Sequence, residues 1–261
     1  MRAQTALAAA FCVMLALCSM MALWIIVLPS TFRASPSNNH GKFLEHYMQL
    51  SPFRPSLITK YKSHPAVQYL HILPAGIWSL CVPLQLTPAL RKSRPKLHKL
   101  VGWAVVLCSV LMFLSVFIIQ HRKLDFIDND YALEFAAFIE HAAAAPSLYN
   151  STMLLALRGV SCFTALSAAW FLLSIITAIR CVVRRDVRSH RIWMVRHVGS
   201  GIGVAVQRCY VLLTARQAMS PTYQMLRFTE GIYIAFALAV AGAELAARCM
   251  QQQSHGGNKV A

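Results

Sequence analysis

The chain has 261 residues, of which 57% are hydrophobic and only 13% are charged. A soluble domain carries about a quarter charged residues, so this composition excludes an ordinary water-soluble protein. The formal net charge of +16 would suit a nucleic-acid partner, but the basic residues cluster in short loops between long apolar runs. That placement instead favours an integral membrane protein whose partners are the bilayer and the anionic lipids of the cytoplasmic leaflet.

Six apolar runs are long enough to cross a hydrocarbon core of about 30 Å at about 1.5 Å per residue. In chain order they are residues 6–28, 66–90, 100–120, 159–183, 192–215 and 229–250. The first run follows Arg2 and exceeds the core of a cleavable signal peptide, so we expect residues 1–28 to be an uncleaved signal anchor. The predicted fold is therefore all-α, a polytopic transmembrane bundle of about six spans.

The short loops predict the orientation of the bundle. Residues 91–99 hold five lysines or arginines and no acid, and residues 184–191 hold four arginines and one aspartate. Both loops should face the cytoplasm, which also places both termini there. The segment between the third and fourth spans is acidic and should lie outside, together with the glycosylation sequon at Asn150. Plasma membrane and endomembranes are not distinguished by these signals.

The remaining segments are assigned around this core. Residues 29–65 form an outer loop, residues 66–250 a multi-span membrane domain, and residues 251–261 a disordered tail. Residues 121–157 contain "YALEFAAFIEHAAAAP", whose acids and histidine make a full span costly. We expect that segment to form a helix at the outer surface, broken near Pro146.

All eight cysteines fall within or at the ends of apolar segments and form no CxxC pair. We therefore expect small packing residues rather than disulfides. Gly199 and Gly203, in "GSGIG", lie inside a predicted span without a preceding strand, which excludes a nucleotide-binding loop. Their spacing predicts a face where another helix or a flat cofactor approaches closely.

Histidines within an apolar chain are the first candidates for chemistry. His71 lies in the second span near its outer end, and His98 stands at the cytoplasmic start of the third. His190 and His197 enclose "HRIWMVRH" and are seven residues apart, so they share one helix face. His71 is either an interhelical hydrogen-bonding residue or a haem or metal ligand. His98 is either an interfacial residue of a basic loop or a ligand or proton-relay group facing the bundle. The stretch from His190 to His197 is either a positive-inside membrane anchor with an interfacial tryptophan or part of a haem site. His121 and His141 are additional outer-side ligands to consider.

Arginines near these histidines would suit an anionic group. Arg191 and Arg196 flank the histidine pair, and arginine forks match the carboxylates of haem propionates. Arg208 lies deep in the fifth span, where arginine usually faces a polar cavity or an anionic ligand. Glu244 lies in the sixth span and is predicted to pair with Arg248 at i,i+4.

Part of the chain resembles a family of predicted membrane proteins. The residues concerned are "YLHILPAGIWSLCVPLQLTPALRKSRPKLHKLVGW", "RRDVRSHRIWMVRH" and "VAVQRCY", from about 66 to 210. They resemble the domain of unknown function 2306, with Lys99 and Trp103 departing from its usual pattern. The resemblance singles out six positions: His71, His98, His190, Arg191, Arg196 and Arg208. The histidine pattern also looks like di-haem membrane cytochromes of the b-561 and ferric-reductase type, in architecture alone.

Two functions remain open from the sequence. One is transmembrane electron transfer through haem b, with His98 and His190 as inner ligands, His71 as an outer ligand, and quinol, ascorbate or ferric iron as electron partners. The other is a non-enzymatic membrane protein, a transporter or an assembly subunit. In that case the histidines hydrogen-bond between helices, and Arg208 lines a polar cavity.

Overall fold

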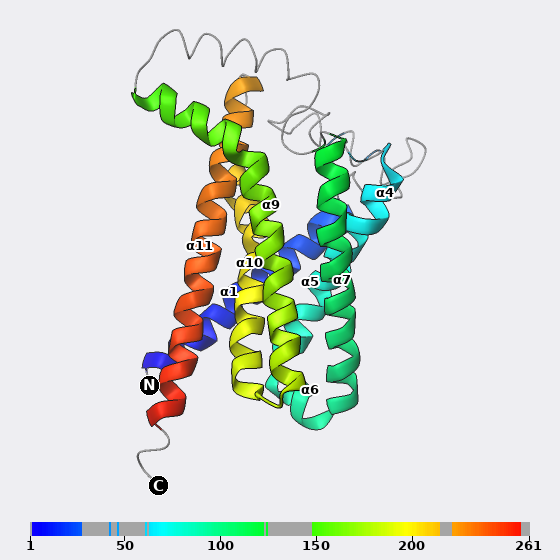
Figure 1. Ribbon diagram of the computed structural model, residues 1–261, viewed down its shortest axis with the longest axis vertical. Helices are drawn as coiled ribbons and strands as arrows, with labels where there is room; N and C mark the ends of the chain where they lie inside the picture. Colours follow the sequence, from blue (N-terminus) through cyan, green and yellow to red (C-terminus); the bar gives the residue numbers. More distant parts are fainter. Residues whose placement is uncertain are drawn as a thin grey trace.

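The structure is a computed structural model that describes residues 2–27, 42, 46, 61, 63–122, 124, 148–214 and 221–256. Every element of these residues is helical (Figure 1). The elements, in chain order, are α1 (Arg2–Val27), α4 (Pro65–Val67), the π-helical turn η1 (Gln68–Ile72), α5 (Leu73–Leu86), α6 (Pro88–Ser93), α7 (Pro95–His121), α9 (Leu148–Val183), α10 (Val187–Thr214) and α11 (Pro221–Gly256). Most of the predicted outer loop 29–65 and of segment 121–157, including His141, lies outside the described residues.

Four described helices are long and apolar enough to cross a membrane. They span Pro65–Leu86, Pro95–His121, Gly159–Val183 and Leu226–Gln252. In α1 the apolar stretch within the described residues is the shorter Ala8–Leu23. Helix α10 does not qualify, because arginines interrupt its apolar sequence. The chain is thus an integral membrane protein whose described residues fold only into helices, and helices also occupy the described residues of the two other predicted runs.

Several helix boundaries differ from those expected. The second run was predicted to continue to residue 90, but α5 ends at Leu86 because Thr87 is extended. Proline disfavours the helical region for the residue before it, and Pro88 follows Thr87. The third helix begins at Pro95 rather than at residue 100, with proline in its first turn. The prediction of disorder was wrong for residues 251–256, because α11 continues to Gly256.

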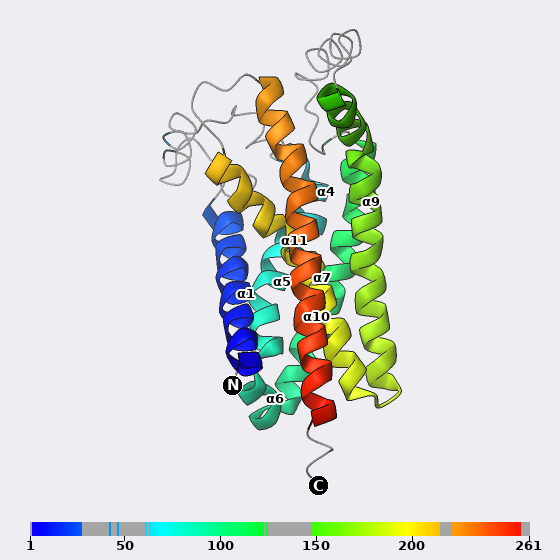
Figure 2. The same ribbon diagram turned by 90° about the vertical axis from the view of Figure 1, so that its left-hand side faces the viewer.

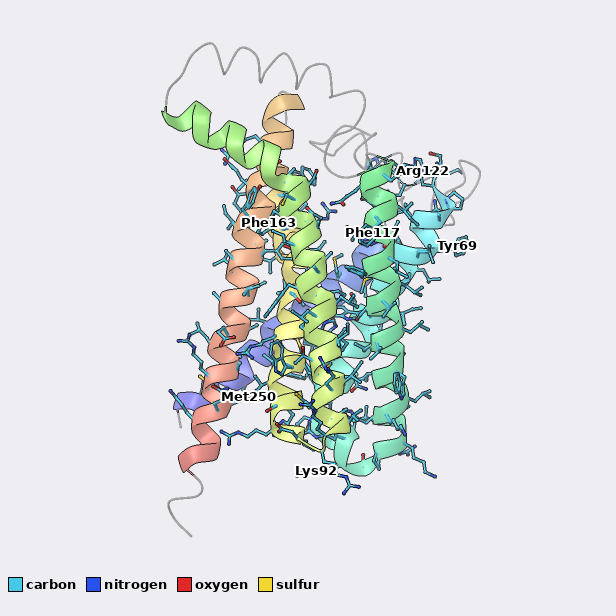
Figure 3. All side chains as sticks on the ribbon, viewed as in Figure 1. Tyr69, Lys92, Phe117, Arg122, Phe163 and Met250 are labelled. Carbon is cyan, nitrogen blue, oxygen red and sulfur yellow. The ribbon has the colours of Figure 1, made fainter. Side chains whose placement is uncertain are left out.

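The helices form an elongated bundle with two distinct ends. Helix α6, the α9–α10 turn and the beginning of α1 lie at one end, where α11 also ends (Figures 1 and 2). We call this the basic end, because it contains residues 91–99 and 184–191. Figure 3 places Lys92 at this end and Arg122 at the opposite one. Helix α1 crosses the other helices obliquely in Figure 1 and packs on α5 and α10.

Helices α10 and α11 pack closely along each other, because small residues line the contact on both helices. A Cβ built on Gly199 would overlap Ala243 of α11, and one on Gly203 would lie 3.2 Å from the ring of Phe236. On α11 a buried alanine recurs at every fourth position, from Ala235 through Ala239 and Ala243 to Ala247. The predicted close-packing face at Gly199 and Gly203 is confirmed, and the neighbour is a helix.

Candidate functional site

Two of the predicted histidines lie together at the basic end. His98 and His190 are each the fourth residue of their helix, α7 and α10 respectively. The His98 imidazole is within electrostatic reach of both His190 and Arg91.

The two rings differ in their hydrogen bonding. His190 donates from Nδ1 to the carbonyl oxygen of Ala178 on α9, at 2.9 Å. This bond fixes the ring orientation and leaves Nε2 as the nitrogen with a lone pair, as in many metal-binding histidines. The Nδ1 atom of His98 is buried and has no hydrogen-bond partner among the described residues. Burying a polar atom without a partner costs about 1–3 kcal/mol. If His98 and His190 served only to pack helices together, nothing in the described part of the chain would offset this cost at His98.

The backbone around His98 is held by a glutamine from the neighbouring helix. Gln85, buried near the end of α5, donates from its side-chain amide to the carbonyl oxygen of His98. A Cβ at Gly102, one turn further along α7, would lie 3.5 Å from the Gln85 side chain, an ordinary van der Waals contact.

His71 lies far from this pair. It is part of the π-helical turn η1, and its Nδ1 is 2.8 Å from Oγ of Ser115 on α7. Ser115 is seventeen residues beyond His98 on the same helix, which corresponds to about 25 Å along the axis. His71 is therefore near the opposite end of the bundle, and π-helical turns are frequent at functional sites.

His197 occupies the centre of the bundle, a role that the sequence did not reveal. The residue is fully buried, and its ring stacks on Phe171 with centroids 4.3 Å apart. Nε2 accepts a hydrogen bond from Nε1 of Trp78 at 3.2 Å and lies 3.1 Å from Oγ of Ser109. Nδ1 lies 3.1 Å from the carbonyl oxygen of Phe171 and 3.2 Å from Oγ of Ser174.

These contacts determine the tautomer of His197. An indole N–H can only donate, so Nε2 of His197 must accept and the ring proton must reside on Nδ1. That proton then points at the carbonyl oxygen of Phe171, which can only accept. The ring is neutral and Nε2 is engaged by Trp78. His197 thereby joins α10 to α5, α7 and α9 and is not available as an axial ligand.

The predicted arginines have separate surroundings. Arg191 is exposed. Arg196 forms a bidentate ion pair with Glu244 of α11, with both N–O distances 2.9 Å. The predicted partner of Glu244, Arg248, lies further away at 3.9 Å. Arg208 places its guanidinium 5.5 Å from the ring centre of Phe228 on α11.

The structure also describes the cysteines, His121 and Asn150. All eight cysteines are free thiols, as expected, and Cys18 and Cys108 are buried. His121 is exposed in the last turn of α7. Asn150 belongs to the first turns of α9, at the end of the bundle opposite the basic end (Figure 1).

Within the described residues, no group of three or more His, Cys, Asp or Glu side chains could hold a metal ion. Haem needs only two axial ligands, so a pair of imidazoles is the arrangement relevant to it. A comparison with protein-family models, curated proteins and solved structures found no match to this chain. The function must therefore be argued from the residues themselves.

Proposed function

We propose that this chain is a membrane protein that binds b-type haem at the His98–His190 pair and transfers electrons. The observation that carries the proposal is the buried Nδ1 of His98, which has no hydrogen-bond partner among the described residues and lies near the imidazole of His190. Nδ1 of His190 donates to the carbonyl oxygen of Ala178, so Nε2 of the neutral ring would be its acceptor nitrogen. A bound prosthetic group would use both features.

The residues around the pair fit the chemistry of haem. His98 and His190 come from different helices, as the two axial ligands of a bundle cytochrome do. Arg191, the next residue on α10, and Arg91 add cationic side chains for the propionates. Haem bound there would supply a one-electron carrier whose reduction potential depends on ligand identity, burial and nearby charge. His71, which contacts Ser115 about 25 Å further along α7, would be a ligand of a second haem nearer the other face.

The topology that we propose has six spans with the basic end in the cytoplasm. Both basic loops and both helical termini of the described chain lie at this end (Figures 1 and 2), which supports that arrangement. Helices α1 and α10 would be the additional spans, with the charges of α10 covered by neighbouring helices. Anionic lipids of the cytoplasmic leaflet would contact residues 91–99 and 184–191. We also propose that the chain belongs to the family with the domain of unknown function 2306, which its sequence resembles.

The test is the visible spectrum of protein purified from haem-replete cells. Wild-type protein should show a Soret band, and His98→Ala and His190→Ala should each reduce it strongly. His121→Ala is the matched control, because His121 is an exposed histidine at the other end of α7. A colourless, folded wild-type preparation would contradict the proposal, as would a Soret band that both inner variants retain.

A second function is favoured by two other observations. His197 and the Arg196–Glu244 pair use their polar groups to connect helices. If His98 and His190 do the same, the chain is a non-enzymatic transporter or assembly subunit, and Arg208 is the residue that contacts a solute. Loss of a bound anion or lipid in Arg208→Ala, from a protein without haem, would support this alternative.

A further inference from the structure

A cluster of charged and aromatic side chains lies on the outward surface of α9, α10 and α11, apart from the histidines discussed above. Arg196 and Glu244 form its bidentate ion pair, and Nε of Arg248 lies 3.9 Å from the same carboxylate. The Arg196 guanidinium is 4.7 Å from the ring centre of Trp193, which in turn lies 5.9 Å from that of Trp170. We call these five residues the interfacial patch.

The charged side chains of the patch are partly exposed, whereas Trp193 is partly buried and packs against the hydrophobic core. The side chains of Arg196, Glu244 and Arg248 are 22%, 38% and 70% exposed. Val240, one turn before Glu244 on α11, is an exposed apolar side chain on the same helix face and would meet lipid. A partly exposed ion pair next to such a residue would meet hydrocarbon, which does not compensate exposed charges.

The depth of the patch can be read from a contact at the basic end. Arg188, at the start of α10, hydrogen-bonds through Nη2 to the carbonyl oxygen of Gln251 on α11, at 3.2 Å. Glu244 is seven residues from Gln251 and Arg196 is eight from Arg188, so the ion pair lies about 10–12 Å above this contact. Arg248 lies between the two levels. The patch thus extends from the basic end toward the hydrocarbon region, at the depth where tryptophan and arginine meet lipid headgroups.

The charges of the patch do not cancel, because two guanidinium groups share one carboxylate. We propose that the interfacial patch is a binding site for one anionic phospholipid, whose phosphate bonds to Arg248 and to the remaining N–H groups of Arg196. Arginine forks match phosphate oxygens, and the two tryptophans supply an amphipathic surface for the glycerol and upper acyl carbons. This site is separate from the haem proposal, because the patch residues are neither of the imidazoles on which that proposal rests.

Brominated lipids test the site, because bromine quenches tryptophan fluorescence at short range. The probe is full-length protein in phosphatidylcholine vesicles with Trp24→Phe and Trp103→Phe, which leaves Trp78, Trp170 and Trp193. Trp78 is 4% exposed and serves as the unquenched background. Brominated phosphatidylglycerol should quench the other two at a mole fraction several times lower than brominated phosphatidylcholine does.

Arg248→Gln should lower the apparent affinity for phosphatidylglycerol about three- to tenfold, as expected for one basic side chain at an anionic lipid surface. Arg184→Gln is the control of equal charge, because Arg184 is exposed at the same end of the bundle. The double variant Arg196→Gln/Glu244→Gln removes the ion pair but leaves Arg248, so it should reduce the preference, and adding Arg248→Gln to it should abolish the preference. Equal quenching by the two lipids would overturn the proposal. An Arg184→Gln effect as large as that of Arg248→Gln, or displacement of the lipid by inorganic phosphate, would do the same.

Discussion

Replacing His197 by alanine should destabilise the bundle more than any other single change among its polar contacts. The imidazole is fully buried, and removal of a buried aromatic side chain costs about 3–5 kcal/mol through the cavity that it leaves. The Trp78 N–H would also lose its acceptor, at about 1–3 kcal/mol. Interhelical hydrogen bonds in membranes often measure below 1 kcal/mol, so we expect a total of about 3–5 kcal/mol. Ser174→Ala should cost less than about 1 kcal/mol, because the Phe171 carbonyl still accepts the Nδ1 proton.

The assay is unfolding in mixed micelles, followed by the reaction of a thiol-specific dye. Cys18 and Cys108 are 1% and 5% exposed, so they report the opening of the core. His197→Ala should shift the midpoint to a much lower denaturant concentration than Ser174→Ala does. A neutral His197→Ala variant, or equal shifts for the two substitutions, would refute the assignment of His197 as the residue that joins four helices.

Three further predictions concern the helix ends and the α10–α11 contact. Arg185 has a φ of 61° just after α9, a conformation that glycine adopts without strain, so Arg185→Gly should raise the free energy of unfolding by up to about 1 kcal/mol. A decrease in the free energy of unfolding by that amount would contradict a left-handed backbone at residue 185. Gly199→Leu should separate α10 from α11 and lower the melting temperature by several degrees. The matched Gly242→Leu, at a position with open space, should leave the melting temperature unchanged. Similar shifts in the melting temperature of the two variants would contradict close packing at Gly199. Hydrogen bonds from the side chain and the backbone N–H of Ser189 lower the pKa of Asp186. The stability that Asp186 contributes is therefore present above the ordinary aspartate pKa and disappears as the pH falls through the lowered value, so the stability difference between wild type and Asp186→Ala should shrink in acid; a constant difference would exclude this role.

The sequence predicted the helices well because long apolar runs and prolines act locally. Helices occupy the described residues of all six predicted runs, and two of the displaced ends coincide with Pro88 and Pro95. The Gly199–Gly203 face was also predictable, since the four-residue spacing of small residues directly indicates close packing. These features depend on neighbouring residues and therefore need no knowledge of the tertiary arrangement.

The partners of polar side chains were harder to predict, because other helices supply them. His190 and His197 share a helix face, yet His197 is buried against three other helices while His190 bonds to Ala178 near the basic end. Local spacing paired Glu244 with Arg248, whereas its bidentate partner is Arg196, 48 residues away in sequence. One sequence does not specify which helices become neighbours, so such contacts become visible only in the folded bundle.

Haem content per polypeptide, determined by the pyridine haemochrome method on purified protein, tests haem binding at the His98–His190 pair most directly. The wild-type protein should contain at least one haem b, and His98→Ala and His190→Ala should each lose one haem, with no change in His121→Ala. Haem content near zero in folded wild-type protein, or content unaffected by either inner substitution, would contradict haem binding at this pair.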